Sequence, residues 1–174
     1  MLIAETSRLM LRQFYFEDVE AMNAVFGDAE VMRYGEGVQS PQWVRSWISS
    51  WINEYYPRQG FGFWAVVIKE TSNVIGYCGL SRFPGRCAAD EAEIGFRLAR
   101  SYWGRGIATE AAAAVRDHGF GSLHLPKIVA IIDPANVASI RVAQKLGLGY
   151  ERDVMFDGYD HPDHVYSQAN LGDG

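Results

Sequence analysis

The sequence has few of the features that mark specialised classes of protein. Its 174 residues include only two cysteines, Cys78 and Cys87, and their spacing matches no metal-binding pattern. We interpret both as reduced thiols that pack inside a cytoplasmic protein. No run of 18 apolar residues occurs, so neither a membrane-spanning helix nor a membrane partner is expected. The formal net charge of −5 argues against nucleic acid as a partner.

Signals for processing or for several domains are also missing. Residues 1–6 lack the basic segment and the long apolar segment of a signal peptide. We find no internal repeat, low-complexity segment or linker. A chain of 174 residues with 48% hydrophobic side chains is long enough to bury one core. We therefore predict one domain spanning residues 1–174.

The most informative stretch is residues 93–110. Apolar and polar side chains alternate over residues 92–98, which predicts a strand, and an alanine-rich segment with helical spacing begins at Ile107. Between them lies a turn with Gly104 and Gly106. The first turn of a helix has backbone N–H groups without internal partners at a positive dipole end, and glycines allow a ligand to approach closely. This turn is therefore either a simple connection between strand and helix or an anion site, most naturally for phosphate.

Two other phosphate-binding motifs fit this turn poorly. A dinucleotide-binding loop needs Gly-x-Gly-x-x-Gly/Ala, whereas Thr109 stands at the last position. That motif also needs an acidic residue at the end of the next strand, and Asp133 lies further along the chain than the motif requires. A P-loop needs Gly-Lys-Ser/Thr, and no lysine follows these glycines.

The rest of the chain predicts an α/β order of elements. We expect Ser40 and Asn136 to be helix N-caps, with Pro41 at the first helical position and Gly147 ending the helix that Asn136 starts. The predicted strands are residues 8–14, 61–69, 74–83 and 127–133, with a closing pair over 150–155 and 164–169, and the other predicted helices are 17–26 and the one starting at 41.

Several motifs resemble the GNAT acetyltransferases, in particular their RimJ/RimL-like (ribosomal-protein N-terminal acetyltransferase) branch. Residues 102–111, Tyr-Trp-Gly-Arg-Gly-Ile-Ala-Thr-Glu-Ala, match the pyrophosphate loop of that branch without a gap, whereas most GNAT proteins have Gln or Arg in place of Trp103. Residues 5–12, 28–34 and 136–147 resemble three other segments of that branch in the same order. The resemblance implies a GNAT-like α/β (α+β) domain, with a mixed, mostly antiparallel central sheet and helices on both faces.

The resemblance also implies acetyl-CoA as the co-substrate. In GNAT proteins, the strand before the loop bonds the pantetheine arm through its backbone like an added strand, which an unpaired strand edge can do. The loop amides hold the pyrophosphate, an asparagine lies near the pantetheine arm, and Arg100 would add positive charge near the phosphates. The cofactor-binding residues implied here are Phe96, Arg97, Leu98, Gly104, Arg105, Gly106, Ile107, Ala108, Thr109, Asn136 and Lys145.

Acyl transfer to an amine requires removal of a proton, because a protonated amine is not a nucleophile. Glu93 is the candidate base, acting directly or through a water, and Glu91 is the second choice. Many GNAT proteins have a tyrosine that acts as the general acid at the position of Ala143, so this sequence departs from that pattern. The ribosomal branch has a serine at the position of Ser139, and we predict that Ser139 protonates the leaving thiolate. The alternative interpretations are a structural ion pair for Glu93 and an ordinary first-turn serine for Ser139.

The resemblance places the acceptor near Arg33 and Tyr34 and near the C-terminal region. That region is rich in aspartate and histidine, and it is interpreted as a solvated loop, as an acidic rim that attracts a cationic amine, or, third, as a metal site. The direct-attack mechanism requires no metal. The helical stripe of aromatic residues is either core or a wall of the acceptor pocket. The aromatic stripe consists of Trp43, Trp47, Trp51, Tyr55 and Tyr56. The aspartates and histidines of the C-terminal region are Asp153, Asp157, Asp160, His161, Asp163 and His164.

Together these observations predict an acetyl-CoA-dependent N-acetyltransferase that attacks the thioester directly. The acceptor is either a protein N-terminal amine or a small amine such as an amino acid, a polyamine or an antibiotic, because function lies in the site and not in the fold. Two other hypotheses stay open: an acyl-CoA-binding module without catalysis, and, less favoured, a dinucleotide-binding oxidoreductase. The chain is a monomer or a homodimer.

Overall fold

The computed structural model of the protein describes residues 1–171, and its strands form a single mixed sheet in the order β1-β2-β3-β4-β5-β6-β8-β7. Neighbouring strands are antiparallel except β5 and β6, which are parallel. This confirms the predicted mixed, mostly antiparallel sheet. The strands are β1 (Leu2–Glu5), β2 (Leu9–Arg12), β3 (Phe63–Ile68), β4 (Val74–Ser81), β5 (Glu91–Leu98), β6 (Lys127–Ile132), β7 (Gly149–Val154) and β8 (Asp163–Ala169).

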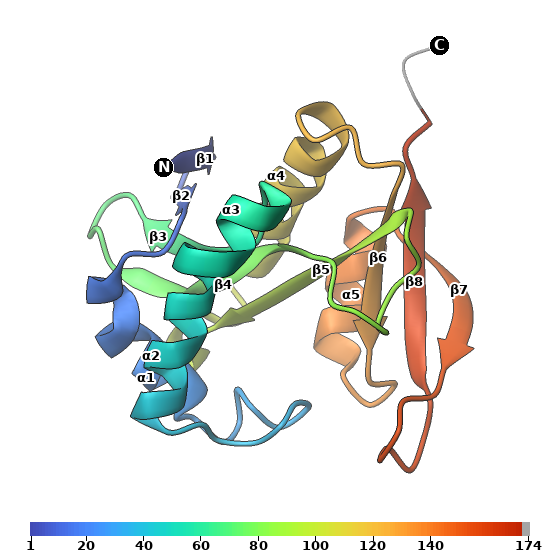
Figure 1. Ribbon diagram of the computed structural model, residues 1–174, viewed down its shortest axis with the longest axis horizontal. Helices are drawn as coiled ribbons and strands as arrows, with labels where there is room; N and C mark the ends of the chain where they lie inside the picture. Colours follow the sequence, from blue (N-terminus) through green and yellow to red (C-terminus); the bar gives the residue numbers. More distant parts are fainter. Residues whose placement is uncertain (172–174) are drawn as a thin grey trace.

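Helices cover both faces of this sheet, as predicted. The short helices α1 and α2 lie on one face, where α1 packs on β4, and α4 packs on β4 and β5 from the other face with α5 beside it (Figure 1). The helical elements are η1 (Phe16–Asp18), α1 (Val19–Phe26), α2 (Pro41–Ser50), η2 (Trp51–Tyr55), α3 (Tyr56–Gln59), η3 (Arg100–Tyr102), α4 (Ile107–Gly121) and α5 (Val137–Lys145).

The alternation of side chains along β3 shows how one strand serves both layers. Phe63 faces α2, and its ring centroid lies 6.3 Å from that of Trp47. The next residue, Trp64, faces α4, where its ring meets His118 edge-on at 5.5 Å. Successive residues of a strand point to opposite faces, so a central strand covered on both sides is apolar throughout. This accounts for the continuous apolar run of β3.

The predicted helix ends are confirmed. Ser40 has extended backbone angles, and its side chain accepts a hydrogen bond from the N–H of Trp43, with Pro41 at the first helical position. The Asn136 side chain accepts a hydrogen bond from the N–H of Ser139 at 3.2 Å. Gly147 follows α5 with a φ of 84°, the left-handed conformation that ends many helices.

Other boundaries differ from the prediction. The predicted strand over 8–14 contains only β2, and the short strand β1, which pairs with it, was not predicted. The helix that begins at Ser40 continues through a π-helical turn to Gly60, which has a φ of 76°. Of the aromatic stripe, Trp51 is fully buried and Tyr56 is 8% exposed, so these two rings belong to the core. Within residues 1–171, no helix combines the length and the apolar character needed to cross a membrane.

Candidate functional site

The sheet opens between β5 and β6. The two strands are paired only from Glu91 and Lys127 to Glu93 and Val129. Beyond that point β5 stays paired with β4 as far as Leu98, and β6 stays paired with β8 to its end. The two strands therefore diverge after Glu93, and the β5 backbone from Ile94 to Leu98 has no ladder partner on the β6 side. An unpaired strand edge offers N–H and C=O groups that an extended amide-containing ligand can match.

A glycine turn follows directly after this open strand. Gly104 and Gly106 have φ values of 71° and 73°, and Gly106 is the N-cap of α4. Within residues 1–171, the backbone N–H groups of residues 104–109 have no hydrogen-bond acceptor, and Glu110 is the first residue bonded back into the helix. The Trp103 indole donates to the Leu98 carbonyl at 2.8 Å and joins the turn to the strand. Free N–H groups at the positive end of a helix fit the predicted anion site.

The basic residues near this turn differ in how they are held. Arg105 is exposed, and its guanidinium lies 5.8 Å from the ring centroid of Tyr102. Arg100 pairs with Asp28 at 3.3 Å, so part of its charge is compensated. Lys145 is exposed near the C-terminal end of α5. The structure adds Arg8, from the turn between β1 and β2, which donates to the Arg105 carbonyl at 3.0 Å. Sequence analysis missed Arg8, because the two residues are far apart in the chain.

Glu93 stands at the point where β5 and β6 diverge. It is 8% exposed, and both of its carboxylate oxygens accept hydrogen bonds from Arg86, at 2.8 and 2.9 Å. Its neighbour across β4 is Ser81, whose buried hydroxyl has no hydrogen-bond partner among residues 1–171. The predicted base is therefore held by one arginine from the β4–β5 loop. Each Glu93 carboxylate oxygen accepts one of these bonds and keeps a second lone pair that can accept a proton from another group.

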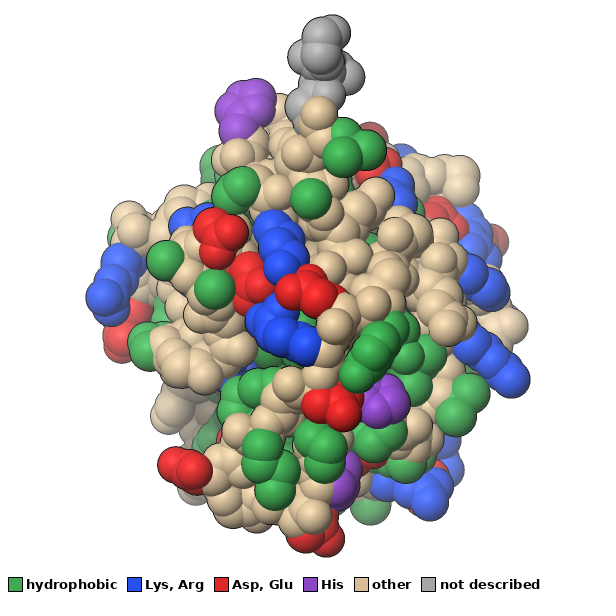
Figure 2. Space-filling view, turned by 90° about the vertical axis from the view of Figure 1, so that its right-hand side faces the viewer, with side chains coloured by type: hydrophobic (Ala, Val, Ile, Leu, Met, Phe, Trp, Pro, Cys, Tyr) green, Lys and Arg blue, Asp and Glu red, His purple; other side chains and the backbone are tan. Residues whose placement is uncertain are grey.

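Glu91 differs from Glu93 in having several partners. It is 2% exposed and accepts hydrogen bonds from the Ala88 N–H at 2.9 Å and from Arg152 at 3.2 Å, and Lys127 lies 3.0 Å away. Burial opposes ionisation, but these donors together lower the pKa of Glu91 below its usual value. Basic and acidic side chains lie next to each other on this face of the molecule, over β7 and β8 (Figure 2). We interpret Glu91 as a structural residue of this network.

Asn136 and Ser139 lie together at the start of α5. The side-chain oxygen of Asn136 accepts the capping hydrogen bond from the Ser139 N–H, which leaves the side-chain NH₂ group for a ligand. Ser139 is half-buried, and among residues 1–171 its hydroxyl has no hydrogen-bond partner. A hydroxyl free at this position is available to donate a proton, and the role of Ser139 as the acid stays a prediction.

Three segments surround a groove on the side of the site away from the glycine turn. Arg33 and Tyr34 come from the segment between α1 and α2, Asp133 from the end of β6, and Tyr159 and Asp160 from the β7–β8 loop. The Tyr34 hydroxyl donates to the Ala135 carbonyl at 3.1 Å and joins the first two segments. The two residues predicted for acceptor binding therefore line one groove.

Arg97 joins this groove to β5. Its guanidinium contacts the backbone of Gly35, where a Cβ would collide with it. The Arg97 side chain thus faces the acceptor side, and its backbone carbonyl lies beside Gly76 of β4.

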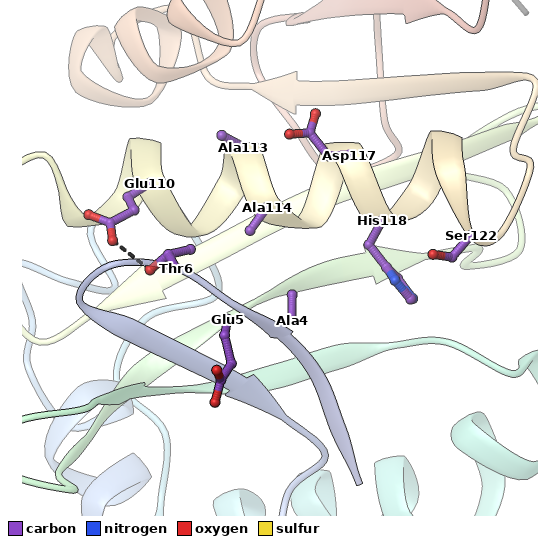
Figure 3. A pocket seen from close by; sticks show the side chains of 9 residues that line it. All are labelled: Ala4, Glu5, Thr6, Glu110, Ala113, Ala114, Asp117, His118 and Ser122. Carbon is purple, nitrogen blue, oxygen red and sulfur yellow. Dashed lines mark hydrogen bonds between the residues drawn. The ribbon is translucent and has the colours of Figure 1, made fainter. Parts of the chain in front are cut away.

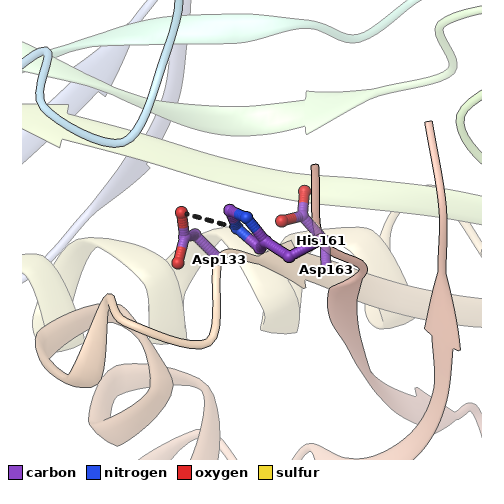
Figure 4. Close-up of side chains that lie close together, drawn as sticks. All are labelled: Asp133, His161 and Asp163. Carbon is purple, nitrogen blue, oxygen red and sulfur yellow. Dashed lines mark hydrogen bonds and ion pairs between the residues drawn. The ribbon is translucent and has the colours of Figure 1, made fainter. Parts of the chain in front are cut away.

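The acidic C-terminal region forms a cluster rather than only a solvated loop. His161 Nδ1 lies 2.6 Å from Asp160, and Nε2 lies 3.2 Å from Asp133, which raises the pKa of His161 (Figure 4). Asp163 is 7% exposed, its Oδ1 has no partner among residues 1–171, and burial, followed by the charge of Asp133, raises its pKa. One atom of each of Asp133, His161 and Asp163 lies within 4.8 Å of the others. The acidic rim and the metal site both stay predictions for this cluster.

Comparison with known proteins gives a consistent result. The family model of the acetyltransferase (GNAT) domain matches residues 8–149. The uncharacterized protein YkkB of Bacillus subtilis (strain 168) is 35% identical over 173 residues, covering 95% of this chain and 94% of its own.

Two solved structures illustrate the likeness in three dimensions. The acetyltransferase (GNAT family) from Bacillus anthracis has a TM-score of 0.80 at 28% identity and covers 98% of this chain and 99% of its own. RimL, a ribosomal L7/L12 alpha-N-protein acetyltransferase in complex with coenzyme A, has a TM-score of 0.80 at 18% identity, covering 97% and 98%, which is a likeness of fold alone.

Proposed function

The chain belongs to the GNAT acetyltransferase family and is an N-acetyltransferase, and we propose that it uses acetyl-CoA to acetylate a primary amine by direct attack on the thioester. This proposal rests on one observation. The open edge of β5 is followed by the glycine turn, whose free N–H groups lie at the N-terminal end of α4. A ligand with an extended chain of amides and a pyrophosphate at its end matches both features. The edge of β5 can pair with the amides, and the glycine turn can bind the pyrophosphate.

The proposed cofactor path follows from this arrangement. The pantetheine arm pairs with the backbone of Phe96, Arg97 and Leu98, and the pyrophosphate takes the N–H groups of residues 104–109. The Asn136 amide reaches the arm from α5, and Arg105 and Lys145 add positive charge. The thioester then lies toward Glu93, where the two strands separate.

The proposed reaction transfers one acetyl group and removes two protons from the acceptor ammonium. The ammonium gives the first proton to the Glu93 carboxylate, directly or through a water. The free amine attacks the thioester carbon, a C–N bond forms, and the nitrogen loses its second proton to the solvent. The tetrahedral intermediate then collapses with loss of the C–S bond. Ser139 gives its proton to the departing thiolate and regains one from the solvent.

The acceptor side favours a cationic small amine. Asp133 and Asp160 line the groove, and Asp163 lies close to Asp133. Their negative charge attracts ammonium groups, and Arg33 and His161 offset it in part. A protein N-terminal amine is the second candidate. It is supported by residues 102–111, which resemble the RimJ/RimL-like branch.

Calorimetric titration with acetyl-CoA tests the proposal. We expect micromolar binding by the wild-type protein, similar binding of desulfo-CoA, no binding of NADH, and loss of binding in Gly106→Trp, because this position has a positive φ and a large side chain blocks the turn. Thiol release with a panel of amines then identifies the acceptor.

The outcomes separate the alternatives. Binding without turnover for every amine and peptide tested would support an acyl-CoA-binding module. Binding of NADH would support an oxidoreductase. An absence of acetyl-CoA binding at millimolar concentration would contradict the proposal.

A further inference from the structure

The turn between β1 and β2 contacts the first turn of α4. One carboxylate oxygen of Glu110 accepts a hydrogen bond from the Thr6 hydroxyl at 2.5 Å (Figure 3). The same oxygen accepts a hydrogen bond from the Arg8 N–H at 3.2 Å, and the Ser7 hydroxyl lies 3.3 Å away. These residues are about a hundred positions apart in the sequence. A carboxylate in the first turn of a helix also interacts favourably with the positive end of the helix dipole.

The Arg8 guanidinium extends this network into the glycine turn. Its Nε and Nη2 atoms bind the second carboxylate oxygen of Glu110, at 2.6 and 2.5 Å, in a forked arrangement. Its remaining nitrogen, Nη1, donates to the Arg105 carbonyl at 3.0 Å. One side chain therefore connects the helix, the strand turn and the glycine turn.

We propose that the Thr6–Arg8 turn and Glu110 hold the glycine turn in its anion-binding conformation, with Arg8 as a positioning residue for the pyrophosphate of acetyl-CoA. This inference rests on the proposed function, because it assumes that the turn binds CoA. It adds a part of the cofactor site that lies far from the loop in the sequence.

The geometry of one peptide bond gives the physical reason. In a trans peptide, the C=O and the following N–H point in opposite directions. The Arg105 carbonyl is held toward Arg8, so the N–H of Gly106 must point to the opposite side of the turn. Gly104 and Gly106 lie on either side of Arg105, and glycine loses the most conformational freedom when it is ordered. An outside hydrogen bond that fixes the peptide reduces the entropy that ligand binding must otherwise overcome.

A simpler role for Arg8 predicts a different result for its partner. If Arg8 only attracted the phosphates by its charge, removing the negative charge of Glu110 would strengthen binding of an anion. If the network positions the turn, the same change weakens binding, because Arg8 loses the carboxylate that orients its guanidinium. Glu110→Gln thus separates the two explanations by the sign of its effect.

The experiment measures CoA affinity by calorimetry for wild type, Arg8→Ala, Arg8→Lys and Glu110→Gln. Lys69→Ala is the matched control, because Lys69 donates to the Thr6 carbonyl at 2.7 Å and so contacts the same turn without reaching α4. We expect CoA affinity to fall about tenfold in Arg8→Ala and about threefold or more in Glu110→Gln. Arg8→Lys should restore only part of the loss, since lysine keeps the charge but lacks the fork.

Enzyme kinetics and the control complete this test. The KM for acetyl-CoA should rise with the dissociation constant, while kcat and the KM for the acceptor stay unchanged. Lys69→Ala should behave as wild type. Unchanged or tighter CoA binding in Glu110→Gln, or full recovery in Arg8→Lys, would overturn the proposal.

Amide hydrogen exchange on the ligand-free protein keeps this inference separate from the proposed function. We expect faster exchange at the hydrogen-bonded amides that begin α4, where the N–H at position 110 donates to the Gly106 carbonyl at 3.0 Å, in Arg8→Ala and Glu110→Gln than in wild type and Lys69→Ala. If wild type bound no CoA while these amides still responded to Arg8, the proposed function would fail but the ordering of the turn would stand. Equal exchange in all variants would overturn the positioning role, whatever binds to the turn.

Discussion

The two sides of the candidate site are built from different parts of the chain. On the proposed cofactor side, the groups available for contacts are the backbone N–H groups of residues 104–109 and the open edge of β5. On the acceptor side, side chains from three loops line the groove, joined by the Tyr34 hydroxyl and by His161 between two carboxylates. Backbone groups are the same for every residue type, whereas side chains change with each substitution. Cofactor binding should therefore tolerate sequence change, and acceptor choice should depend on it.

Two glutamates on β5 differ in the number of hydrogen-bond donors around them. Glu91 and Glu93 are two residues apart on one face of the strand, and both are buried. Glu91 has three donors around it, whereas Glu93 has only Arg86 among the hydrogen-bond donors that the described residues supply. A carboxylate with one partner can exchange it for a substrate, and one with three partners serves stability.

The largest predicted effect separates these two glutamates. Glu93→Gln should lower kcat by about 10²–10⁴ from about pH 6 to 9, because the acceptor amine then has no base. Glu91→Gln is the matched control: it should keep kcat but lower the free energy of unfolding by about 1–3 kcal/mol, since Lys127 and Arg152 lose one carboxylate partner and keep Glu151. Steady-state kinetics and urea denaturation measure the two effects. Normal activity of Glu93→Gln across this range would show that Glu93 is not the base.

A smaller effect is expected on the leaving-group side. Ser139→Ala should lower kcat about tenfold while the KM for acetyl-CoA is unchanged, because a thiolate leaves readily even without an acid. The side chain that caps α5 belongs to Asn136, so the melting temperature should not change. Thiol release measures the rate, and calorimetry measures the stability. Unchanged turnover would leave Ser139 as an ordinary first-turn residue.

Gly35→Ala tests the link between β5 and the acceptor groove. An alanine methyl group at this position would displace the Arg97 guanidinium. We expect a cost of about 1 kcal/mol in stability, the low end for overpacking, because a flexible side chain yields. The KM for the acceptor should rise while CoA affinity stays the same. Gly121→Ala, which meets no atom within 4 Å, is the control. A change in CoA affinity alone would place Arg97 on the cofactor side.

The smallest effect is a gain in stability at the acidic cluster. Because burial raises the folded-state pKa of Asp163 above its unfolded value, ionisation of Asp163 destabilises the fold as pH rises through these two values. Asp163→Asn removes that penalty, so it should stabilise the protein by about 1 kcal/mol at neutral pH and not at about pH 3, where both forms are uncharged. Thermal unfolding at both pH values measures the difference. Equal stability at neutral pH would show that the Asp163 carboxylate is compensated.

Much of the cofactor side was visible in the sequence because its signals are local. Gly104 and Gly106 between a strand and a helix, and Asn136 before α5, are patterns of neighbouring residues, and the structure confirms the turn and the cap. The prediction failed where stability comes from distant contacts. The strand β1 is short and has no strong alternation, and it exists because it pairs with β2.

The sequence alone determined the order of the elements other than β1, the helix ends at Ser40, Asn136 and Gly147, and the position of the glycine turn, because backbone preferences act over a few residues. Only the tertiary structure decided that β5 and β6 part after Glu93, that Arg86 holds this carboxylate, and that Arg8 and Glu110 brace the glycine turn. Strand register and long-range hydrogen bonds depend on how the whole core packs. No local pattern in the chain encodes them.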